Sequence, residues 1–504
     1  MSFIRQRQNL LICFSLCCFV VVINFITMPK HNYPGDPMAT RSATTTLLRT
    51  GNWDVPVAVV LHLSQEKGQY YFQNTTNKKL YSKYGILNTV LYIPPILIEK
   101  WYRGELDYDA ESRIRTLLLN IFNIIISIVI TVYLFFLLSL YTKSSCIKVI
   151  FILAAFYSTF LWNYLRAPTF EIFHVLFFLM FYYHLIKYKR QSDTDNDSFH
   201  LLASVLSLVL LCLCKLVFML LIPLLCSALL LIGYQPAESI FQHTIKQLRS
   251  HHKTYVLYLI LPIAGMLAII LLTNHYKFGS PFETGYSQWA ANENLFGGDL
   301  RIGIIGFLFS SQRSIFLHFP VLLVALLGIK TFYTKHAFDT LFAAATFILF
   351  LLTYSKFIHW AGEACYGPRY LLFILPVLSL PLVEVLHHLF SSIKKRKKQL
   401  LLVFLTGMTL YSILLQVHVN SLRFHTYYKL EHIMNKASYF RYEDLKKYMQ
   451  ILHFGQIYHD LIHYEKFGDT FYPLETFRGR FDKNNFAKME KDLQNMIQYN
   501  YWLF

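Results

Sequence analysis

The chain has 504 residues, of which 55% are hydrophobic, 17% aromatic and only 15% charged. This composition excludes a water-soluble globular protein, and several apolar stretches can cross roughly 30 Å of hydrocarbon at ~1.5 Å per residue. A net charge of +18 would suggest nucleic-acid binding in a soluble chain. Here many basic residues lie in short loops between apolar segments, as orientation signals do. The sequence therefore predicts an all-α polytopic membrane protein that binds no nucleic acid.

The first apolar segment, residues 9–27, follows Arg5 and Arg7. This order also fits a cleaved signal peptide. However, the apolar run Leu10–Ile26 is longer than a usual signal core, and no clear small-x-small cleavage site follows it. We therefore expect an uncleaved signal-anchor helix within residues 1–27.

Residues 28–113 form a predicted external loop with interfacial helices. The apolar stretch Ile86–Ile98 is interrupted by Pro94 and Pro95. It is too short to span a bilayer comfortably, which favours an interfacial or re-entrant helix.

A bundle of ten further spans is predicted within residues 114–418. The apolar run 200–233 carries Lys215 at its middle. We divide it there, because a single long helix would invert the membrane orientation of every later span and move the KKRKK run (394–398) outside. The spans are 114–141, 147–163, 168–188, 200–214, 216–233, 254–273, 315–330, 337–355, 367–389 and 400–418.

Charge near the span ends predicts the orientation of the resulting eleven spans. Lys and Arg in the short loops and their flanks number seventeen on the predicted cytoplasmic side and seven on the external side. Positive charge gathers on the cytoplasmic side of membrane proteins. The N-terminus is therefore expected inside. The C-terminal tail, residues 419–504, is expected outside as a small helical cap rich in Tyr, Phe, His and Lys.

Most unusual polar motifs fall on the predicted external face. A membrane protein that gathers polar clusters on one face is expected to have a site there. The motifs are YPGDP (33–37), KYG (83–85), RAPTFE (166–171), FGSPFETGY (278–286), SSQRS (310–314) and WAGEACYGPRY (360–370).

Asp36 is the candidate general base. It lies in a Pro-Gly-Asp-Pro turn near the predicted membrane surface, where partial desolvation is expected to raise its basicity. A turn-capping aspartate is the alternative.

Cations on the same face suit a ligand that carries a phosphate. An arginine at that depth is costly unless it meets an anion. A structural ion pair of Arg166 with Glu171 or Asp36, and snorkelling at the interface, are the alternatives. The candidates are Lys83, Arg166, Arg313 and Arg369, and Lys215 can reach the same face from a helix end.

The segment WAGEACYGPRY places Trp360, Tyr366 and Tyr370 beside Glu363 and Arg369. Aromatic faces with carboxylate and arginine partners suit a sugar ring, and they equally suit the aromatic belt at a membrane interface.

The order of the motifs resembles the GT-C superfamily of membrane glycosyltransferases, which includes protein O-mannosyltransferases and the aminoarabinose transferases that modify lipid A. The resemblance covers most of residues 30–385, and its last two segments are the most specific. It rests on Asp36 with the following TTTLLRTGNW, YSKYG (81–85), NHYKFGSPFETGY before GFLFSSQRSIFLHFP, and WAGEACYGPRYLLFILP.

The resemblance implies an enzyme that takes a sugar from a polyprenyl-phosphate donor, without a nucleotide sugar. The acceptor is a lipid, glycan or protein on the non-cytoplasmic side. Asp36 is the implied base, in a single displacement with inversion, and Arg166, Arg313 and Arg369 are the implied phosphate ligands beside Lys83. The candidate substrate contacts are Tyr84, Glu171, Glu283, Tyr286, Trp360, Glu363 and Tyr366.

Cofactors and partners follow from the same resemblance. Many relatives carry an acidic pair in the first loop, whereas here Pro37 follows Asp36. Hard cations prefer several carboxylates, so we expect no cofactor, although a divalent metal stays open. The expected partners are the lipid-linked donor, an external acceptor and membrane lipids. The expected location is a bacterial inner membrane with the site facing the periplasm.

A transporter or flippase of polyprenyl-linked glycans is the rival function. Such proteins usually have two similar halves and polar residues at the middle of the membrane. The sequence has no halves of matching pattern, and apart from Lys215, Glu384 and scattered histidines its spans are apolar. The transferase is therefore favoured.

Overall fold

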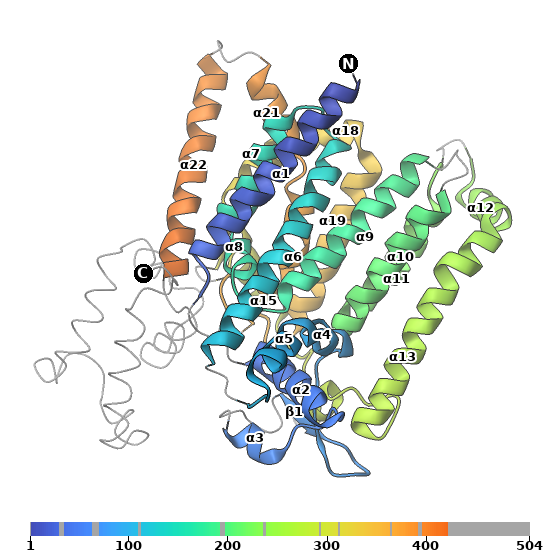
Figure 1. Ribbon diagram of the computed structural model, residues 1–504. Coiled ribbons are helices and arrows are strands. Elements are labelled where there is room, and N and C mark those ends of the chain that lie inside the picture. Colours follow the sequence, from blue (N-terminus) through green and yellow to red (C-terminus); the bar gives the residue numbers. More distant parts are fainter. Residues whose placement is uncertain are drawn as a thin grey trace, which may run out of the picture.

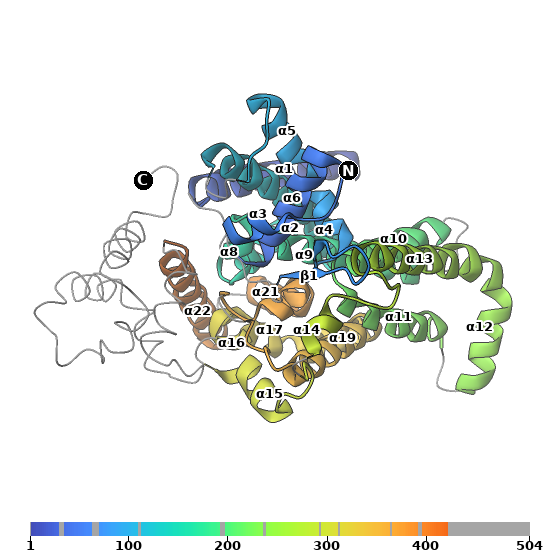
Figure 2. The same cartoon turned by 90° about the horizontal axis from the view of Figure 1, so that it is seen from below.

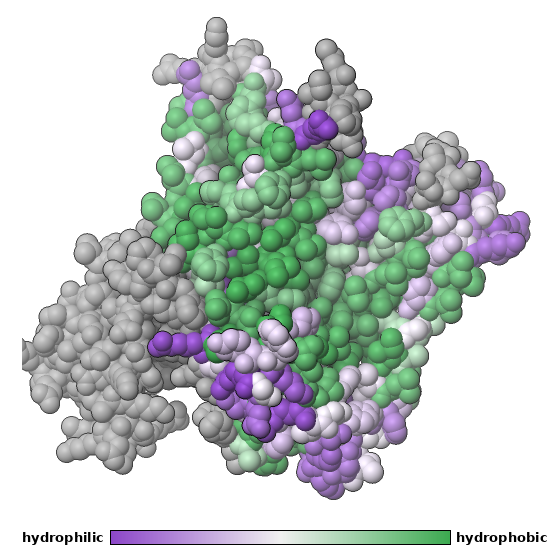
Figure 3. Space-filling view, in the orientation of Figure 1, coloured by the Kyte–Doolittle hydropathy of each residue, from purple (hydrophilic) through white to green (hydrophobic). Residues whose placement is uncertain are grey.

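The computed structural model describes residues 2–29, 35–62, 70–108, 112–191, 197–234, 238–291, 294–310, 313–362, 365–391 and 396–421. Long helices run side by side as a bundle, and shorter elements of the first loop form a layer at one end (Figure 1). Apolar residues cover the middle of the visible face, and hydrophilic residues gather toward its ends (Figure 3). This distribution is that of a protein whose middle lies in hydrocarbon.

The N-terminal part contains one long helix and the layer of the first loop. Figure 2 shows this layer from below, over the ends of the longer helices. The elements are α1 (Ser2–Ile26), α2 (Asp36–Thr50), α3 (Val57–His62), the antiparallel strands β1 (Tyr71–Gln73) and β2 (Leu80–Ser82), α4 (Ile86–Leu91) and α5 (Ile93–Arg103).

The middle of the chain is helical. Its elements are α6 (Arg113–Ser139), α7 (Ser145–Tyr157), α8 (Leu161–Leu165), α9 (Glu171–Gln191), α10 (Asp197–Cys214), η1 (Leu216–Leu220), α11 (Leu221–Leu230), α12 (Ile240–Tyr255), η2 (Val256–Ile260) and α13 (Leu261–Phe278).

The last described part completes the bundle. Its elements are α14 (Tyr286–Ala290), α15 (Leu300–Phe309), α16 (Ile315–His318), α17 (Val321–Leu327), α18 (Ile329–Lys335), α19 (Ala337–Lys356), η3 (Arg369–Ile374), α20 (Leu375–Leu378), α21 (Leu382–Phe390) and α22 (Arg396–Ser421).

Six helical stretches among the described residues are long and apolar enough to cross a membrane. This finding confirms a multi-pass helical membrane protein, while the count of eleven spans and the orientation stay predictions. The stretches are Arg7–Ile26, Arg113–Ser139, Ile240–Phe278, Ala337–Lys356, Arg369–Phe390 and Gln399–Val417.

The apolar run 200–233 is divided at Lys215, as expected. Helix α10 ends at Cys214, Lys215 has extended backbone (φ −154°, ψ 120°), and η1 begins at Leu216. The end of α10 meets the first loop, since the Asn88 amide donates to the carbonyl of Cys214 over 2.9 Å. The far end of α11 meets α12 instead, where Gln247 donates to the carbonyl of Ile232. The chain therefore reverses its direction at Lys215.

Other predicted spans are shorter or broken. The predicted span 315–330 is interrupted at Phe319 and Pro320, between α16 and α17. Helix α15 was not predicted as an element. The Asp299 side chain caps its start by accepting from the backbone N–H groups of Arg301 and Ile302, which is the usual role of aspartate at an N-cap.

Two prolines of the first loop lie at the start of helix α5. Pro94 and Pro95 lie in the first turn of α5, where a missing N–H leaves no intrahelical bond unmade. Trp101 and Tyr102 near the end of α5 are 86% and 70% exposed. Exposed aromatic rings at this place suit the interfacial helix that the sequence predicts.

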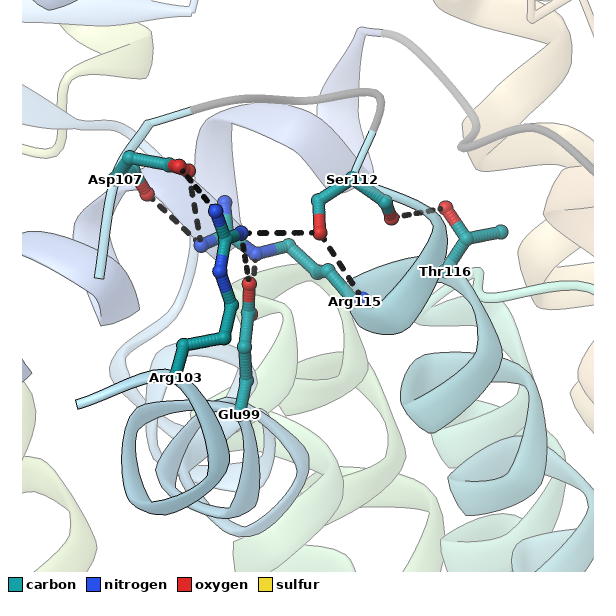
Figure 4. Close-up of polar contacts among 6 residues, drawn as sticks. All are labelled: Glu99, Arg103, Asp107, Ser112, Arg115 and Thr116. Atoms are coloured by element: carbon teal, nitrogen blue, oxygen red, sulfur yellow. Dashed lines mark hydrogen bonds and ion pairs between the residues drawn. The ribbon is translucent and has the colours of Figure 1, made fainter. Parts of the chain in front are cut away.

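A buried ion-pair network fastens α5 to the start of α6 (Figure 4). The carboxylate of Glu99 is fully buried and lies 2.6 Å from Arg115 Nε and 3.3 Å from Arg103 Nη1. Arg103 also donates to the hydroxyl of Ser112, which caps α6. Glu99 is the acid that both arginines share, so its removal would take the nearest carboxylate from the buried Arg115. The network therefore holds the first-loop layer against the bundle.

Candidate active site

A cavity of about 610 Å³ lies where the first-loop layer meets the bundle. Its lining comes from the first loop, α9, the junction of α10 with η1, the segment around α14, and the ends of α19 and η3. Most of the lining is aromatic or aliphatic. Five charged side chains also line it, namely Asp36, Lys83, Glu171, Lys215 and Arg369.

Asp36 is the first residue of α2. Gly35 precedes it with φ 75°, a conformation that favours glycine, and Pro37 lies in the first turn of the helix. These neighbours fix the backbone so that the carboxylate meets the cavity. Its Oδ1 accepts a hydrogen bond from the Tyr84 hydroxyl, and its Oδ2 lies 3.1 Å from Arg369 Nη1.

Opposing effects set the pKa of Asp36. Burial raises the pKa, but the positive charges of Arg369 and Lys83 and the hydrogen bond from Tyr84 outweigh it, so the pKa is lowered. Asp36 is therefore ionised at neutral pH. Desolvation acts in the direction that the sequence analysis expects, but the net pKa is lowered, because the cations around the carboxylate outweigh it.

Tyr84 is a neutral donor beside this carboxylate. Burial and the charge of Asp36 raise the pKa of Tyr84 well above its usual value. The backbone here is held close to α10, since a Cβ at Gly85 would collide with the carbonyl oxygens of Leu213 and Cys214. The glycine of the YSKYG motif thus lets the first loop approach α10, and Lys83 and Tyr84 line the cavity.

Arg369 joins the two carboxylates of the cavity. Its Nη1 lies 3.1 Å from Asp36 Oδ2 and 3.4 Å from Glu171 Oε1. Its Nε is buried and has no hydrogen-bond partner among the described residues. This N–H group can donate to a further anion.

Lys83 is surrounded by aromatic rings. Its Nζ lies 3.6 Å from the centre of the Trp289 ring and 5.3 Å from that of Tyr286. The ring of Trp289 also stacks with that of His359, and the two ring centres lie 5.1 Å apart. Cation–π attraction therefore holds the ammonium in the cavity wall.

Lys215 is a third cation of the cavity. Its Nζ lies 4.6 Å from the centre of the Tyr370 ring and 5.2 Å from that of Tyr354, and these two rings are stacked at 4.4 Å. Burial and the nearby charge of Arg369 lower the pKa of Lys215 to about 8. Lys215 is therefore charged below about pH 8 and loses its charge above it.

The structure brings part of the predicted site together. Asp36, Lys83, Tyr84, Glu171, Tyr286 and Arg369 line the cavity. Glu363 lies outside the described residues. Arg166, Glu283, Arg313, Trp360 and Tyr366 are not part of the lining, and their roles as ligand contacts stay predictions.

The two other predicted phosphate ligands are fully buried. Arg166 donates to the side chain of Asn420 over 3.1 Å and to the carbonyl of Thr27 over 2.6 Å. Arg313 donates to the carbonyl of Ala361. Backbone carbonyls and amides thus supply polar partners for both guanidinium groups.

The remaining predicted contacts have local partners. Glu283 accepts from the Ser287 hydroxyl over 2.7 Å. Trp360 packs on Phe307, and the Tyr366 hydroxyl lies 3.3 Å from His318 Nδ1.

Sequence reasoning missed His174 and Trp289, which line the cavity. Trp289 follows the predicted FGSPFETGY motif by three residues and could have been found there. His174 sits in the apolar sequence of α9, where a lone histidine carries little signal.

No three His, Cys, Asp or Glu side chains gather to hold a metal ion in the part of the chain that the structure describes. The cavity carboxylates of Asp36 and Glu171 share the guanidinium of Arg369. The expectation that the site works without a metal stays a prediction.

No protein-family model and no curated protein matches the sequence. Among solved structures, the apo oligosaccharyltransferase of Archaeoglobus fulgidus matches with a TM-score of 0.52 and 12% identity, over 90% of this chain and 60% of that one. ArnT from Cupriavidus metallidurans, bound to undecaprenyl phosphate, matches with a TM-score of 0.48 and 9% identity, over 81% of this chain and 71% of that one.

The likeness to the archaeal enzyme concerns the fold. The chain spans 60% of the length of that oligosaccharyltransferase, and the match covers 90% of the chain. The fold that the order of motifs predicted is therefore confirmed: the protein has the fold of the GT-C membrane glycosyltransferases.

Proposed function

We propose that the protein is a glycosyltransferase that moves a sugar from a polyprenyl-phosphate donor to an acceptor on the non-cytoplasmic side of the membrane. One observation carries this proposal. One cavity is lined both by the charged side chains of Asp36, Lys83 and Arg369 and by many apolar side chains, Leu220 and Phe373 among them. A polyprenyl-phosphate sugar has the same division between a charged, polar head and an apolar chain.

The charges of the cavity suit one phosphodiester. Three cations, Lys83, Lys215 and Arg369, face the two carboxylates Asp36 and Glu171, so one positive charge is in excess. A sugar linked to a lipid through one phosphate carries one negative charge. Binding such a donor would neutralise the cavity, which favours it in a poorly hydrated site.

The proposed reaction begins when the donor phosphate takes Arg369 away from Asp36. Asp36 then accepts the proton of an acceptor hydroxyl or amine as that group attacks the anomeric carbon. The bond from the anomeric carbon to the phosphate oxygen breaks, and its electron pair leaves with the polyprenyl phosphate. Arg369 and Lys83 stabilise this leaving group. One displacement inverts the configuration of the sugar.

The acceptor is a lipid, a glycan or a protein in this proposal, and the site faces the periplasm of a bacterial inner membrane. The distribution of Lys and Arg between the predicted loops supports this orientation. The fold shared with an oligosaccharyltransferase supports the transfer of a sugar rather than its transport.

The experiment uses the full chain in lipid nanodiscs with a panel of radiolabelled short-chain polyprenyl-phosphate hexoses and pentoses, and membrane extract as the acceptor source. Wild type is expected to transfer label from at least one donor. Asp36→Asn is expected to lower the rate ~10²–10⁴-fold, because the amide cannot accept a proton, while it still binds bare polyprenyl phosphate.

Asp54→Asn is the matched control. Asp54 is another carboxylate of the first loop, it lies 3.2 Å from Lys79, and it does not line the cavity. Wild-type rates are expected for it. If Asp36→Asn transfers sugar at a rate within a few-fold of wild type, Asp36 is not the base and only caps the turn. Movement of the sugar lipid across the bilayer without transfer would favour the flippase.

A further inference from the structure

Three buried polar atoms in the wall of the cavity have no hydrogen-bond partner among the described residues. They are Oδ1 of Asn88, Oε2 of Glu171 and Nε2 of His174. The three residues are 1%, 7% and 6% exposed. Leaving a buried polar atom unpaired is unfavourable, and three in one cavity wall call for a ligand that pairs with them.

The first loop and α9 supply these atoms to the cavity wall. Glu171 and His174 are three residues apart on α9 and so lie on the same face. Asn88 of α4 uses its amide nitrogen to hold the carbonyl of Cys214, and its oxygen is the atom that lacks a partner. Both elements meet at the junction of α10 with η1.

An aromatic wall leads from Asp36 to these atoms. Tyr84, which donates to Asp36, lies 5.6 Å from the ring of Phe170. Phe170 lies 5.7 Å from His174, whose ring is 5.1 Å from that of Phe218. A ring that packs along this wall has Asp36 at one end and His174 at the other.

We propose that Asn88, Glu171 and His174 form a subsite that binds hydroxyl groups of the transferred sugar. This inference rests on the proposed function and deepens it. The carboxylate of Glu171 and the amide oxygen of Asn88 accept hydrogen bonds, and the imidazole accepts or donates according to its tautomer. Hydroxyl groups can serve all three atoms.

The chemistry of the subsite disfavours a phosphate there. The oxygens of Glu171 and Asn88 would repel phosphate oxygens, whereas Arg369, Lys83 and Lys215 attract them. Glu171 also shares Arg369 Nη1 with Asp36, so the hydroxyl subsite lies directly beside the base. A sugar bound there has its phosphate next to Arg369. A site that pairs with a hydroxyl rejects analogues that lack it, so this subsite selects the donor sugar.

The test compares two probes on the full chain in nanodiscs: a short-chain polyprenyl phosphate, and the same lipid phosphate carrying a hexose or pentose. His174→Phe keeps a ring and removes Nε2. The variant is expected to bind the best sugar-bearing lipid about tenfold more weakly than wild type, and to bind the bare lipid within twofold of wild type.

His184→Phe is the matched control. His184 is a buried histidine on the same helix that does not line the cavity, so neither affinity is expected to change. His174→Gln keeps a hydrogen-bonding amide and is expected to retain more of the affinity for the sugar-bearing lipid than His174→Phe. Thermal unfolding of each variant checks that it is folded.

The outcomes separate the subsite from the proposed function. An equal loss for both lipids, or no loss for either, overturns the hydroxyl subsite and leaves the transferase proposal standing. If His174→Phe does not fold, His174→Leu, which also lacks a hydrogen-bonding group, takes its place, and a wild-type preference of that variant for the sugar-bearing lipid overturns the subsite. Failure of wild type to bind either lipid overturns the polyprenyl-phosphate function itself, and the subsite with it.

Discussion

Helix α9 carries a charged cluster at each end, and the two clusters differ in how well their atoms are paired. At its C-terminal end, Lys189 and Arg190 lie 3.3 Å and 3.2 Å from the two carboxylate oxygens of Asp339. The Tyr141 hydroxyl also donates to Asp339 over 2.9 Å. At its N-terminal end, Glu171 shares Arg369 with Asp36.

Both clusters suit the helix dipole, since an acid lies at the start of α9 and two bases lie at its end. Each oxygen of Asp339 has a partner, whereas one oxygen of Glu171 and Nε of Arg369 have none among the described residues. The paired cluster fastens α9 to α19. The underpaired cluster has capacity for a ligand. Pairing, rather than charge or burial, therefore distinguishes the two.

The largest expected effect tests whether the clusters face opposite sides of the membrane. A reporter that is active only outside the cytoplasm is expected to work when fused after residue 418. It is expected to fail within the KKRKK run (394–398), because basic loops stay inside. Equal membrane yield of both fusions is the control. The reverse pattern would put the C-terminal tail inside and invert the predicted orientation.

A stability measurement tests the structural cluster. Asp339→Asn leaves Lys189 and Arg190 without their carboxylate, and is expected to lower the free energy of unfolding in detergent by about 3–5 kcal/mol. The pair of Asp54 with the exposed Lys79 offers the comparison, since Asp54→Asn is expected to lower the free energy of unfolding much less than Asp339→Asn does. If the Asp339→Asn protein is as stable as wild type but does not transfer sugar, this cluster has a role in function and not in stability.

A substitution at Arg369 tests the underpaired cluster. Arg369→Ala is expected to lower the initial rate of transfer about 10²–10³-fold. Arg369→Lys is expected to be damaging as well, because an ammonium lacks the planar fork that grips phosphate. The control is Arg49→Lys, at a guanidinium that lies over the Tyr108 ring and away from the cavity. Wild-type turnover by Arg369→Lys would exclude the phosphate clamp.

The smallest expected effect is a pH dependence. The pKa of Lys215 is lowered to about 8, so its charge is present below that pH and is lost as the pH rises through it. A donor phosphodiester keeps its own charge over this range. Its affinity is therefore expected to fall about tenfold between about pH 7 and pH 9. Lys215→Arg should remove the dependence, and an unchanged slope would exclude Lys215 from donor binding.

The membrane class, the reversal at Lys215 and the GT-C fold could be predicted, because hydropathy, charged loops and motif order carry those signals. The predicted base Asp36 and the cations Lys83 and Arg369 line one cavity. Arg166 and Arg313 lie outside its lining. Sequence cannot tell an arginine that bonds to buried carbonyls from one that faces a cavity, because that depends on tertiary contacts.

The same limit explains what was missed. His174 lies in an apolar helix, so only the packing of Phe170 and Phe218 around it indicates a cavity wall. The pKa of Asp36 depends on Lys83 and Arg369, which are distant in sequence. Breaks such as that between α16 and α17 follow from local backbone geometry that hydropathy does not record.

The most direct test of the central claim is an experimental structure of the protein in nanodiscs, determined with and without a short-chain polyprenyl phosphate. Without lipid, Arg369 is expected to pair with Asp36 and Glu171. With lipid, the phosphate is expected within hydrogen-bond distance of Arg369, with the Arg369–Asp36 pair broken and the carboxylate of Asp36 free to accept a proton. A bound lipid whose phosphate lies elsewhere while this pair stays intact would contradict the proposed site.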